Sequence, residues 1–382
     1  MRHIKILHCA DLHLGSELSD IPIRAQERKQ ELLRTFRKIV TICNDENVDL
    51  LLIAGDLFEG SNIDPQTVQS VKDYLHELDH TITVIAPGNH DYVSIDSPLA
   101  DDDWPEQTIV LGDGPQRAIF ADRGFAIYGA GFRSTYVDQP LLPQLPEADL
   151  DLINICVLHG DLVSEGGTSR YNPVTERQLA ASGYDYVALG HIHKRSPVYK
   201  VSQTSYAYPG CPDGRGFDEL DEKGVYIGTV GKHNVDLTFR NICSRMYLAV
   251  EADISDCSSE PEIVRTIISR LEELYGSEYK NNYYKIILLG SVSENFTLPL
   301  QTIQDNLNER LYFAKLIDNT RIAIDLEEVA TENSLKGIFV RKMMERIEEQ
   351  TANDNLPGAN QLTKALEWGL RAFESEVQLI DY

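Results

Sequence analysis

Short apolar runs in the first half of the chain each end in polar or ionisable residues. The clearest run spans residues 48–58, where a Leu- and Ile-rich stretch ends abruptly in Gly-Asp. An uninterrupted apolar run of this kind is typical of a strand that is buried on both faces. Four further runs share the design, and they are residues 4–13, 81–91, 152–161 and 184–193. The pattern therefore predicts five buried strands that carry polar side chains at their carboxyl ends.

Amphipathic segments alternate with these strands. Apolar residues spaced three and four apart predict a helix from Ile23 to about Asn44, and we expect its six basic residues to form a solvated face. Asp64 as the cap and Pro65 at the first position mark the start of a second helix. This order of elements is typical of a parallel sheet covered by helices on both faces.

The pattern changes twice farther along the chain. Residues 197–242 alternate like antiparallel strands, which a mostly parallel core with antiparallel additions, or two packed sheets, would explain. From Cys243, three strands and two helices alternate as a small α/β unit, and the tail predicts two helices around a break at residues 353–358. We expect domains at 1–242, 243–330 and 334–382. The last would either pack on the chain's own body or offer its apolar face to a partner.

Composition places the chain among ordinary globular proteins. It has 382 residues, of which 42% are hydrophobic and 25% are charged. No run approaches the roughly 20 apolar residues of a membrane span, and the N-terminal apolar run is too short for a signal peptide. Six scattered cysteines without a Cys-x-x-Cys pair favour free thiols in a reducing compartment. We therefore expect a cytoplasmic protein that does not enter membranes.

The net charge of −25 bears on the partners of the protein. Proteins that bind nucleic acid through its phosphates present basic surfaces, so this charge counts against nucleic acid as a substrate. Nucleic acid stays compatible with it if basic residues are concentrated locally or if a partner supplies them. Bound metal ions would also provide a local positive field.

The residues at the predicted strand ends are of three chemical types, His, Asp and Asn. They occur in the order Asp-x-His, Gly-Asp, Gly-Asn-His-Asp, His-Gly and Gly-His-x-His. A single histidine beside an apolar strand is more often a satisfied core or surface residue, but five such motifs in this context indicate a shared site. Open α/β sheets place their ligands at the carboxyl ends of their strands. We infer that these residues converge on a pair of metal ions that share Asp56.

These motifs resemble those of the calcineurin-like metallophosphoesterase superfamily. Within it, the segments Ala-Asp-Leu-His-Leu-Gly, Gly-Asp-Leu-Phe-Glu-Gly, Pro-Gly-Asn-His-Asp and Gly-His-Ile-His-Lys resemble SbcD-type DNA exonucleases of double-strand-break repair, particularly the YhaO-like bacterial branch. The match covers residues 1 to about 215, and residues 208–217 resemble a loop of that branch. After Gly-Asp this chain has Leu-Phe-Glu-Gly, whereas phosphoprotein phosphatases continue to a distal Asp-Arg-Gly, which argues against that branch. Some relatives carry His or Asp where Glu59 stands, so the role of Glu59 is open.

The resemblance implies two metal positions that share one carboxylate. Three residues would hold the first metal, namely Asp11, His13 and His193. Three others would hold the second metal, namely Asn89, His159 and His191, and Asp56 would bridge both. Imidazole mixed with oxygen ligands suits manganese, iron or zinc better than magnesium or calcium, and manganese is the first choice.

The resemblance also implies roles for residues around the metals. His90 would protonate the leaving oxygen or bind the phosphate, and Asp91 would either orient His90 or only form the turn. Three cations that follow the last motif would contact a phosphodiester backbone, or else only aid solubility, namely Lys194, Arg195 and Arg215.

The implied fold is a four-layer α/β/β/α phosphoesterase domain with a small α/β capping domain and a C-terminal helical segment. The implied reaction is two-metal hydrolysis of phosphodiester bonds in DNA, as in a repair nuclease. The helical tail would dock on a coiled-coil ATPase, because this chain has no Walker motif of its own, and a homodimer is a further expectation. Two alternatives are a phosphoesterase for nucleotides or cyclic nucleotides, which the charge favours, and a metal-retaining scaffold without catalysis.

Overall fold

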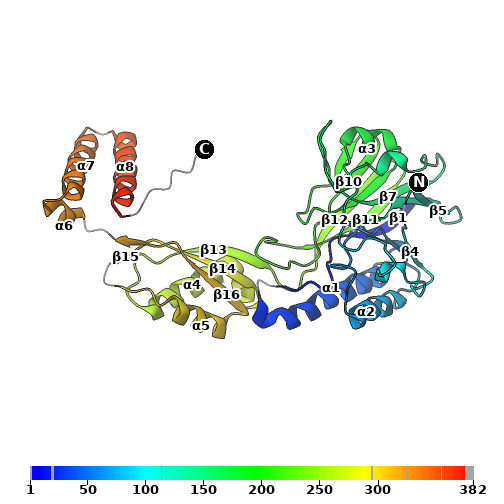
Figure 1. Cartoon of the computed structure of the whole chain (residues 1–382), viewed down its shortest axis with the longest axis horizontal. Helices are drawn as coiled ribbons and strands as arrows, with labels where there is room; N and C mark the ends of the chain where they lie inside the picture. Colours follow the sequence, from blue (N-terminus) through cyan, green and yellow to red (C-terminus); the bar gives the residue numbers. More distant parts are fainter. Residues whose placement is uncertain are drawn as a thin grey trace. The chain divides into compact units, whose positions relative to one another are not determined.

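The chain divides into two compact units, each described here by itself (Figure 1). The computed structural model describes residues 2–18, 21–112, 114–293, 296–323, 326–353 and 355–374. Unit 1 is discontinuous and consists of Met1–Ala249, Glu278–Lys285 and Leu311–Ala314; unit 2 contains the remainder. The division into domains at 1–242, 243–330 and 334–382 stays a prediction, and residues 375–382 of the predicted tail lie outside the described residues.

Two six-stranded sheets form the centre of unit 1. The first contains, in spatial order, β12 (Asn234–Asn241), β11 (Gly224–Gly231), β1 (His3–Cys9), β2 (Leu50–Ile53), β3 (Ile82–Ile85) and β4 (Thr108–Val110). The second contains β5 (Gln116–Phe120), β6 (Phe125–Ala130), β7 (Ile153–His159), β8 (Tyr186–Gly190), β10 (Thr204–Ala207) and β9 (Tyr199–Val201). Strands β1 to β4 are parallel, as are β6, β7, β8 and β10, whereas β5, β9, β11 and β12 pair antiparallel. The structure therefore has both a mostly parallel core with antiparallel additions and two packed sheets, the two explanations that the sequence pattern allowed.

The apolar strands are buried on both faces because helices cover the outer side of each sheet. In β1, Ile4 and Ile6 point between the sheets, while Leu7 and Cys9 point toward the helices. The first sheet is covered by α1 (Ala25–Asp45) and α2 (Pro65–His76), and the second by the short α3 (Glu176–Ser182). The predicted four-layer α/β/β/α fold is confirmed.

The start of α2 follows the predicted cap, but one expectation for α1 is wrong. The Asp64 carboxylate accepts a hydrogen bond from the Gln66 amide at 3.4 Å. In α1, however, Arg28 is fully buried rather than part of a solvated face. Its position lies one helical turn before Leu32 on the apolar stripe, so the helix carries this charge into the interior.

Unit 2 continues three strands that begin in unit 1. These are β13 (Tyr247–Asp253), β14 (Tyr283–Leu289) and β16 (Phe313–Asp318), which form one sheet, with α4 (Glu260–Tyr275) and α5 (Leu300–Arg310) on one face (Figure 1). A short parallel pair follows, β15 (Ser291–Ser293) and β17 (Arg321–Ala323). The pattern in the sequence predicted α4, α5 and their flanking strands, but it did not resolve β16.

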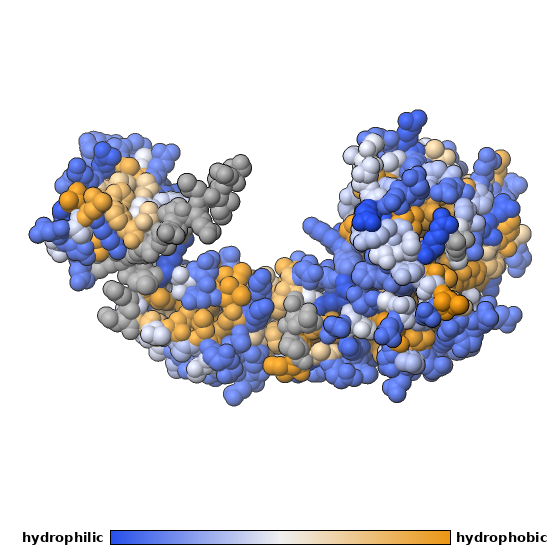
Figure 2. Space-filling model, viewed as in Figure 1, coloured by the Kyte–Doolittle hydropathy of each residue, from blue (hydrophilic) through white to orange (hydrophobic). Residues whose placement is uncertain are grey.

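Three helices close the described chain, namely α6 (Leu326–Thr331), α7 (Leu335–Ala352) and α8 (Leu356–Glu374). Val340 and Met343 of α7 pack against Leu366 and Leu370 of α8, so the two predicted tail helices form a pair with its own small core. Apolar residues also lie on the surface of this pair (Figure 2), among them Leu335, which is 72% exposed. No helix in the described ranges is long and apolar enough to cross a membrane.

Candidate metal centre

Residues that follow the central strands of both sheets come together at the carboxyl ends of those strands. The contributing positions are Asp11 after β1, Asp56 after β2, Asn89 after β3, His159 at the end of β7, and His191 and His193 after β8. Potential ligand atoms lie within 4.8 Å of one another in three groups, namely Asp11, His13 and His193; His13, Asp56 and His90; and Asp56, His159 and His191. The structure therefore brings together the side chains that the sequence assigned to two metal positions.

The first group is built around two histidines from different sheets. His13 Nε2 lies 3.1 Å from His193 Nε2 and 3.6 Å from Asp56 Oδ2, and His193 Nε2 lies 4.0 Å from Asp11 Oδ1. For bonds of about 2.1 Å, neighbouring ligands of a tetrahedral or octahedral ion lie roughly 3.0–3.4 Å apart. The spacing of the two imidazoles is that of ligands around a single cation.

The second group has the same spacing. Asn89 Oδ1 lies 3.0 Å from His159 Nε2 and 3.1 Å from His191 Nδ1, and these two nitrogens are 3.3 Å apart. Asp56 Oδ2 lies 3.3 Å from His159 Nε2. Because the same oxygen of Asp56 faces His13 in the first group, its position is that of a carboxylate shared by two cations.

Two carboxylates orient the histidines of the first group. Nδ1 of His13 lies 2.7 Å from Glu59 Oε2 as an ion-pair contact, and Nδ1 of His193 donates to Glu219 Oε1 at 2.7 Å. A neutral imidazole that donates from Nδ1 presents a lone pair at Nε2, as metal-binding histidines do. The two Nε2 lone pairs therefore face each other, an arrangement that a cation between them would stabilise.

The histidines of the second group are oriented differently. His159 Nδ1 donates to the backbone carbonyl of Ala54 at 2.9 Å, which leaves Nε2 free to act as a ligand. His191 presents Nδ1 to the group, and its Nε2 lies 3.3 Å from Asp161 Oδ1. The sequence analysis missed the orienting roles of Asp161 and Glu219. Asp161 stands two residues after His159, at the end of the run 152–161, whereas Glu219 lies in no recognised motif.

The backbone around these side chains adopts an uncommon conformation. Asp11, His13, Asp56 and His191 have positive φ angles of 55°, 46°, 49° and 104°. Such conformations are rare for residues other than glycine, and they concentrate at functional sites where the surrounding structure enforces them. Here the loops after β1 and β2 hold each other, since the Asp11 amide donates to the Gly55 carbonyl at 3.0 Å and the His13 amide to the Asp56 carbonyl at 2.9 Å.

Burial makes the charges of the centre depend on one another. Burial raises the pKa of Asp11, and it would do the same for Asp56, but the neighbouring His159 holds the pKa of Asp56 well below its usual range. Burial alone would lower the pKa of His159, yet the Asp56 carboxylate raises it to about 9. Carboxylates withdrawn from water require a positive partner. With neutral imidazoles, this donor set fits divalent cations.

His90 lies at the rim of the centre. Its side chain is 39% exposed, its ring centroid lies 4.7 Å from that of His13, and its Nδ1 is 3.5 Å from Glu59 Oε1. Its backbone amide donates to Asp56 Oδ1 at 3.0 Å. His90 is therefore within reach of both the centre and the solvent.

Asp91 connects two loops through the backbone. Its oxygens accept hydrogen bonds from the amides of Leu57 at 2.8 Å, Phe58 at 3.2 Å and Gly88 at 2.7 Å. These contacts correspond to the turn-forming alternative. The orienting of His90 by Asp91 stays a prediction.

The three predicted substrate cations differ in their surroundings. Lys194 is exposed, and the Arg195 guanidinium lies 3.9 Å from the centre of the Phe239 ring. Arg215 is only 18% exposed and pairs with Glu59 at 2.9 Å and with Glu219 at 2.8 Å. Its guanidinium is therefore occupied by the two carboxylates that orient His13 and His193.

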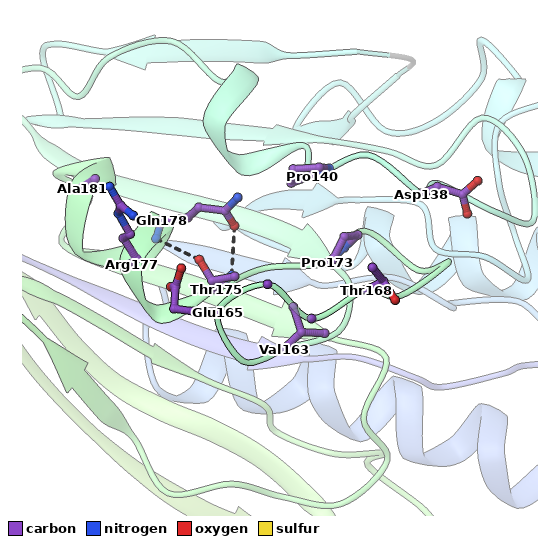
Figure 3. A pocket seen from close by; sticks show the side chains of 12 residues that line it. Asp138, Pro140, Val163, Glu165, Thr168, Pro173, Thr175, Arg177, Gln178 and Ala181 are labelled. Atoms are coloured by element: carbon purple, nitrogen blue, oxygen red, sulfur yellow. Dashed lines mark hydrogen bonds between the residues drawn. The ribbon is translucent and has the colours of Figure 1, made fainter.

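Two pockets in unit 1 differ in their relation to the centre. One of about 590 Å³ adjoins it and is acidic, with Glu17, Glu59, Asp218 and Glu219 in its wall beside Arg215. Another, of about 510 Å³, lies beside α3, where Thr175 and Gln178 cap the helix reciprocally (Figure 3). Neither pocket is lined by the seven predicted ligands, but the first contains Glu59 and Glu219, which contact His13 and His193, whereas the second contains neither carboxylate.

Comparison with protein families gives one match that contains the whole centre. The family described as calcineurin-like phosphoesterase matches residues 4–195. This range includes nearly all of β1, the strands β2 to β8, the seven predicted ligands and His90, but not β9 to β12, Arg215 or Glu219.

Curated proteins with similar sequences include bacterial and archaeal ones. YhaO of Bacillus subtilis, named an uncharacterized metallophosphoesterase, is 27% identical over 284 residues, which cover 71% of this chain and 68% of that protein. Two proteins named DNA double-strand break repair protein Mre11 are also similar. The one from Methanopyrus kandleri is 27% identical over 58% of this chain, which spans about half of that relative, 52%. The one from Archaeoglobus fulgidus is 24% identical over 92% of this chain and 83% of its own length.

Proposed function

Because the chain belongs to the calcineurin-like phosphoesterase family, we propose that it hydrolyses phosphodiester bonds in DNA with two divalent metal ions, preferably manganese. The observation that carries this proposal is the sharing of Asp56 Oδ2 between two groups of ligand atoms, 3.6 Å from His13 Nε2 and 3.3 Å from His159 Nε2. This arrangement supports a two-metal phosphoesterase centre.

We propose the division of ligands that the family resemblance implies. Asp11, His13 and His193 would hold one ion, Asn89, His159 and His191 the other, and Asp56 both. When bound, the ions would supply positive charge to the reacting phosphate and lower the pKa of a water molecule.

Other residues of the chain would orient the metal ligands and act on the substrate. Glu59 and Glu219 lie beside Nδ1 of His13 and of His193, and they would favour the tautomer that places the proton on Nδ1 and directs Nε2 toward an ion. His90, at the exposed rim, would donate a proton to the leaving oxygen or bind the phosphate.

DNA as the substrate is supported by the motif resemblance and by similarity to the two Mre11 proteins. A second candidate, a phosphoesterase for nucleotides or cyclic nucleotides, is favoured by the net charge of −25 and by the acidic pocket beside the centre. Both would repel a long polyanion more than a small one.

A partner for the tail is part of the proposal. The pair α7–α8 leaves apolar side chains exposed, among them Leu335 and Leu356, which are 72% and 60% accessible, and exposed apolar side chains suit contact with a helix of another protein. We propose that it docks on a coiled-coil ATPase. A homodimer remains an expectation from the resemblance.

The test is manganese-dependent digestion of end-labelled DNA by wild type and His90→Ala. We expect the variant to keep both metals but to lose activity by about 10²-fold or more, because a proton donor contributes that much. The matched control is His233→Ala, since His233 is 41% exposed and pairs with Asp185 at 3.2 Å, much as His90 pairs with Glu59.

Each alternative has its own outcome. Equal activity of wild type and His90→Ala would remove the assigned role of His90. Cleavage of cyclic nucleotides but not of DNA would establish the small-molecule alternative. Two bound ions without hydrolysis of any phosphodiester would indicate a scaffold.

A further inference from the structure

One arginine joins the two carboxylates that orient the histidines of the first group. Arg215 Nη1 donates to Glu59 Oε2 at 2.9 Å, and Nη2 donates to Glu219 Oε1 at 2.8 Å. Of the same two oxygens, Glu59 Oε2 lies 2.7 Å from His13 Nδ1, and Glu219 Oε1 accepts from His193 Nδ1 at 2.7 Å. A closed chain of contacts therefore runs from one histidine through Arg215 to the other.

The contacts of Arg215 with Glu59 and Glu219 are largely shielded from water. The side chains of Arg215 and Glu219 are 18% and 3% exposed, so water competes little for their charges. The planar guanidinium presents donors in a fixed fork, which sets the angle between the two carboxylates as well as their charge. Without it, Glu219 would be a buried carboxylate with His193 as its main partner, and Glu59, which is 31% exposed, could turn toward water.

The second group does not depend on Arg215. His159 is oriented by the backbone carbonyl of Ala54, and His191 by Asp161, which in turn accepts a hydrogen bond from the Ser169 hydroxyl. These contacts come from the loops after β2 and β7. The influence of Arg215 is therefore confined to one side of the centre.

The loop that carries Arg215 is itself fixed to α1. Asp213 accepts from the Arg28 guanidinium, from the Thr35 hydroxyl at 2.6 Å and from the Ser244 amide at 3.1 Å. The Arg215 amide donates to Glu219 Oε2 at 2.7 Å, which closes the loop on itself. Arg215 is thus held in place from both its backbone and its side chain.

We propose that Arg215 is a positioning residue that fixes the first metal position selectively, and not a contact for the substrate. It acts through Glu59 and Glu219 on the Nε2 atoms of His13 and His193. The inference rests on the proposed function only in that it assumes two metal positions.

The test compares Arg215→Gln, Arg215→Lys and a matched control, Lys72→Gln. Lys72 is likewise buried, 5% exposed, and bridges two carboxylates, Asp101 at 2.8 Å and Asp103, but it contacts none of the proposed ligands. The first measurement is the manganese(II) binding isotherm, in which electron paramagnetic resonance reports the concentration of the free ion. The second is the exchange-coupled signal of the bound pair of ions.

We expect wild type and Lys72→Gln to bind two ions and to show the coupled signal. Arg215→Gln should bind one ion normally and the other 10- to 100-fold more weakly, because loss of a partner behind a ligand has that effect on metal affinity. In Arg215→Gln, the exchange-coupled signal of a manganese pair should be replaced by the signal of a single bound manganese ion. Arg215→Lys, which keeps the charge but not the fork, should fall between the two.

Two results would overturn the inference. If Arg215→Gln binds both ions like wild type and only raises KM, Arg215 is a substrate contact. If both sites weaken equally, and Lys72→Gln behaves the same way, its role is general stability. A wild-type protein that takes up fewer than two ions would instead contradict the proposed two-metal function itself.

Discussion

Four of the seven predicted ligands have a left-handed backbone, which at the scale of the residue is the most unusual property of the centre. They are Asp11, His13, Asp56 and His191. Each such conformation costs about 1–3 kcal/mol for a residue other than glycine. The loops after β1 and β2 enforce it through hydrogen bonds such as His13 amide to Asp56 carbonyl, 2.9 Å. The side chains are thereby aimed before any ion binds.

Gly55 shows how closely the loops approach, and it gives the first prediction at this scale. It has φ +96°, and a Cβ there would lie 2.1 Å from His159 Nδ1. We expect Gly55→Ala to displace His159 from the Ala54 carbonyl, to destabilise the protein by about 1–3 kcal/mol and to weaken the second metal position. Urea denaturation and manganese titration measure the two effects.

The control lies in the same loop. Gly60 has no atom within 4 Å of a Cβ built on it, so Gly60→Ala should leave both stability and metal binding close to wild type. If Gly55→Ala bound two ions with unchanged affinity, the orienting role of the Ala54 carbonyl would be refuted.

The convergence of the polar residues was accessible from the pattern because they follow apolar strands, whereas the resemblance implied which seven of them are ligands. Strands of a parallel sheet end at one edge, so a one-dimensional pattern is enough to predict their convergence. Glu219 could not be found in this way. It lies 26 residues after His193, in a loop whose path depends on the burial of Asp213 against α1, which no local pattern encodes.

At the scale of elements, α1 and the loop 208–217 are joined by one buried arginine. Arg28 is fully buried, donates to Glu31 at 2.8 Å, and reaches Asp213 and the Gly214 carbonyl. It was expected to be solvated because charged residues on a helix usually are. Position 28 is in line with Leu32 at the helical period, but an apolar pattern does not count an arginine, so its burial was not predicted.

We expect the loss of the ion pair between Arg28 and Asp213 to destabilise the protein. In Arg28→Met, Asp213, which is 2% exposed, would keep its hydrogen bonds from Thr35 and Ser244 but lose its cation, so we expect the free energy of unfolding to fall by about 3–5 kcal/mol. The control is Arg37→Met on the same helix. The pair between Arg37 and Glu77, with side chains 56% and 42% exposed, should contribute less than about 1 kcal/mol. Equal losses in urea denaturation of the two variants would contradict the assigned role of Arg28.

At the scale of the whole molecule, unit 1 includes short segments that return from far along the chain. Tyr283 at the start of β14 stacks on Tyr247 at the start of β13, with ring centroids 4.4 Å apart and planes at 5°. Both rings belong to the core beneath α1. A pattern read along the sequence predicts contiguous domains, because it carries no information on which distant aromatic rings stack.

The contribution of Tyr283 to stability can be tested by comparing two truncated chains. We expect a chain that stops at Ala249 to be less stable than one that stops at residue 333, by more than about 3 kcal/mol, since only the shorter chain lacks Tyr283. Thermal unfolding with manganese present measures this difference. Equal transition temperatures for the two chains would show that Tyr283 is dispensable for unit 1.

The backbone passes between the two units five times, after Ala249, Ser277, Lys285, Arg310 and Ala314. One proteolytic nick therefore cannot liberate unit 1 as an intact fragment. For the same reason, recombination at any single junction could not transfer unit 1 to another protein as a cassette. Unit 1 is complete only in a chain that extends to Ala314.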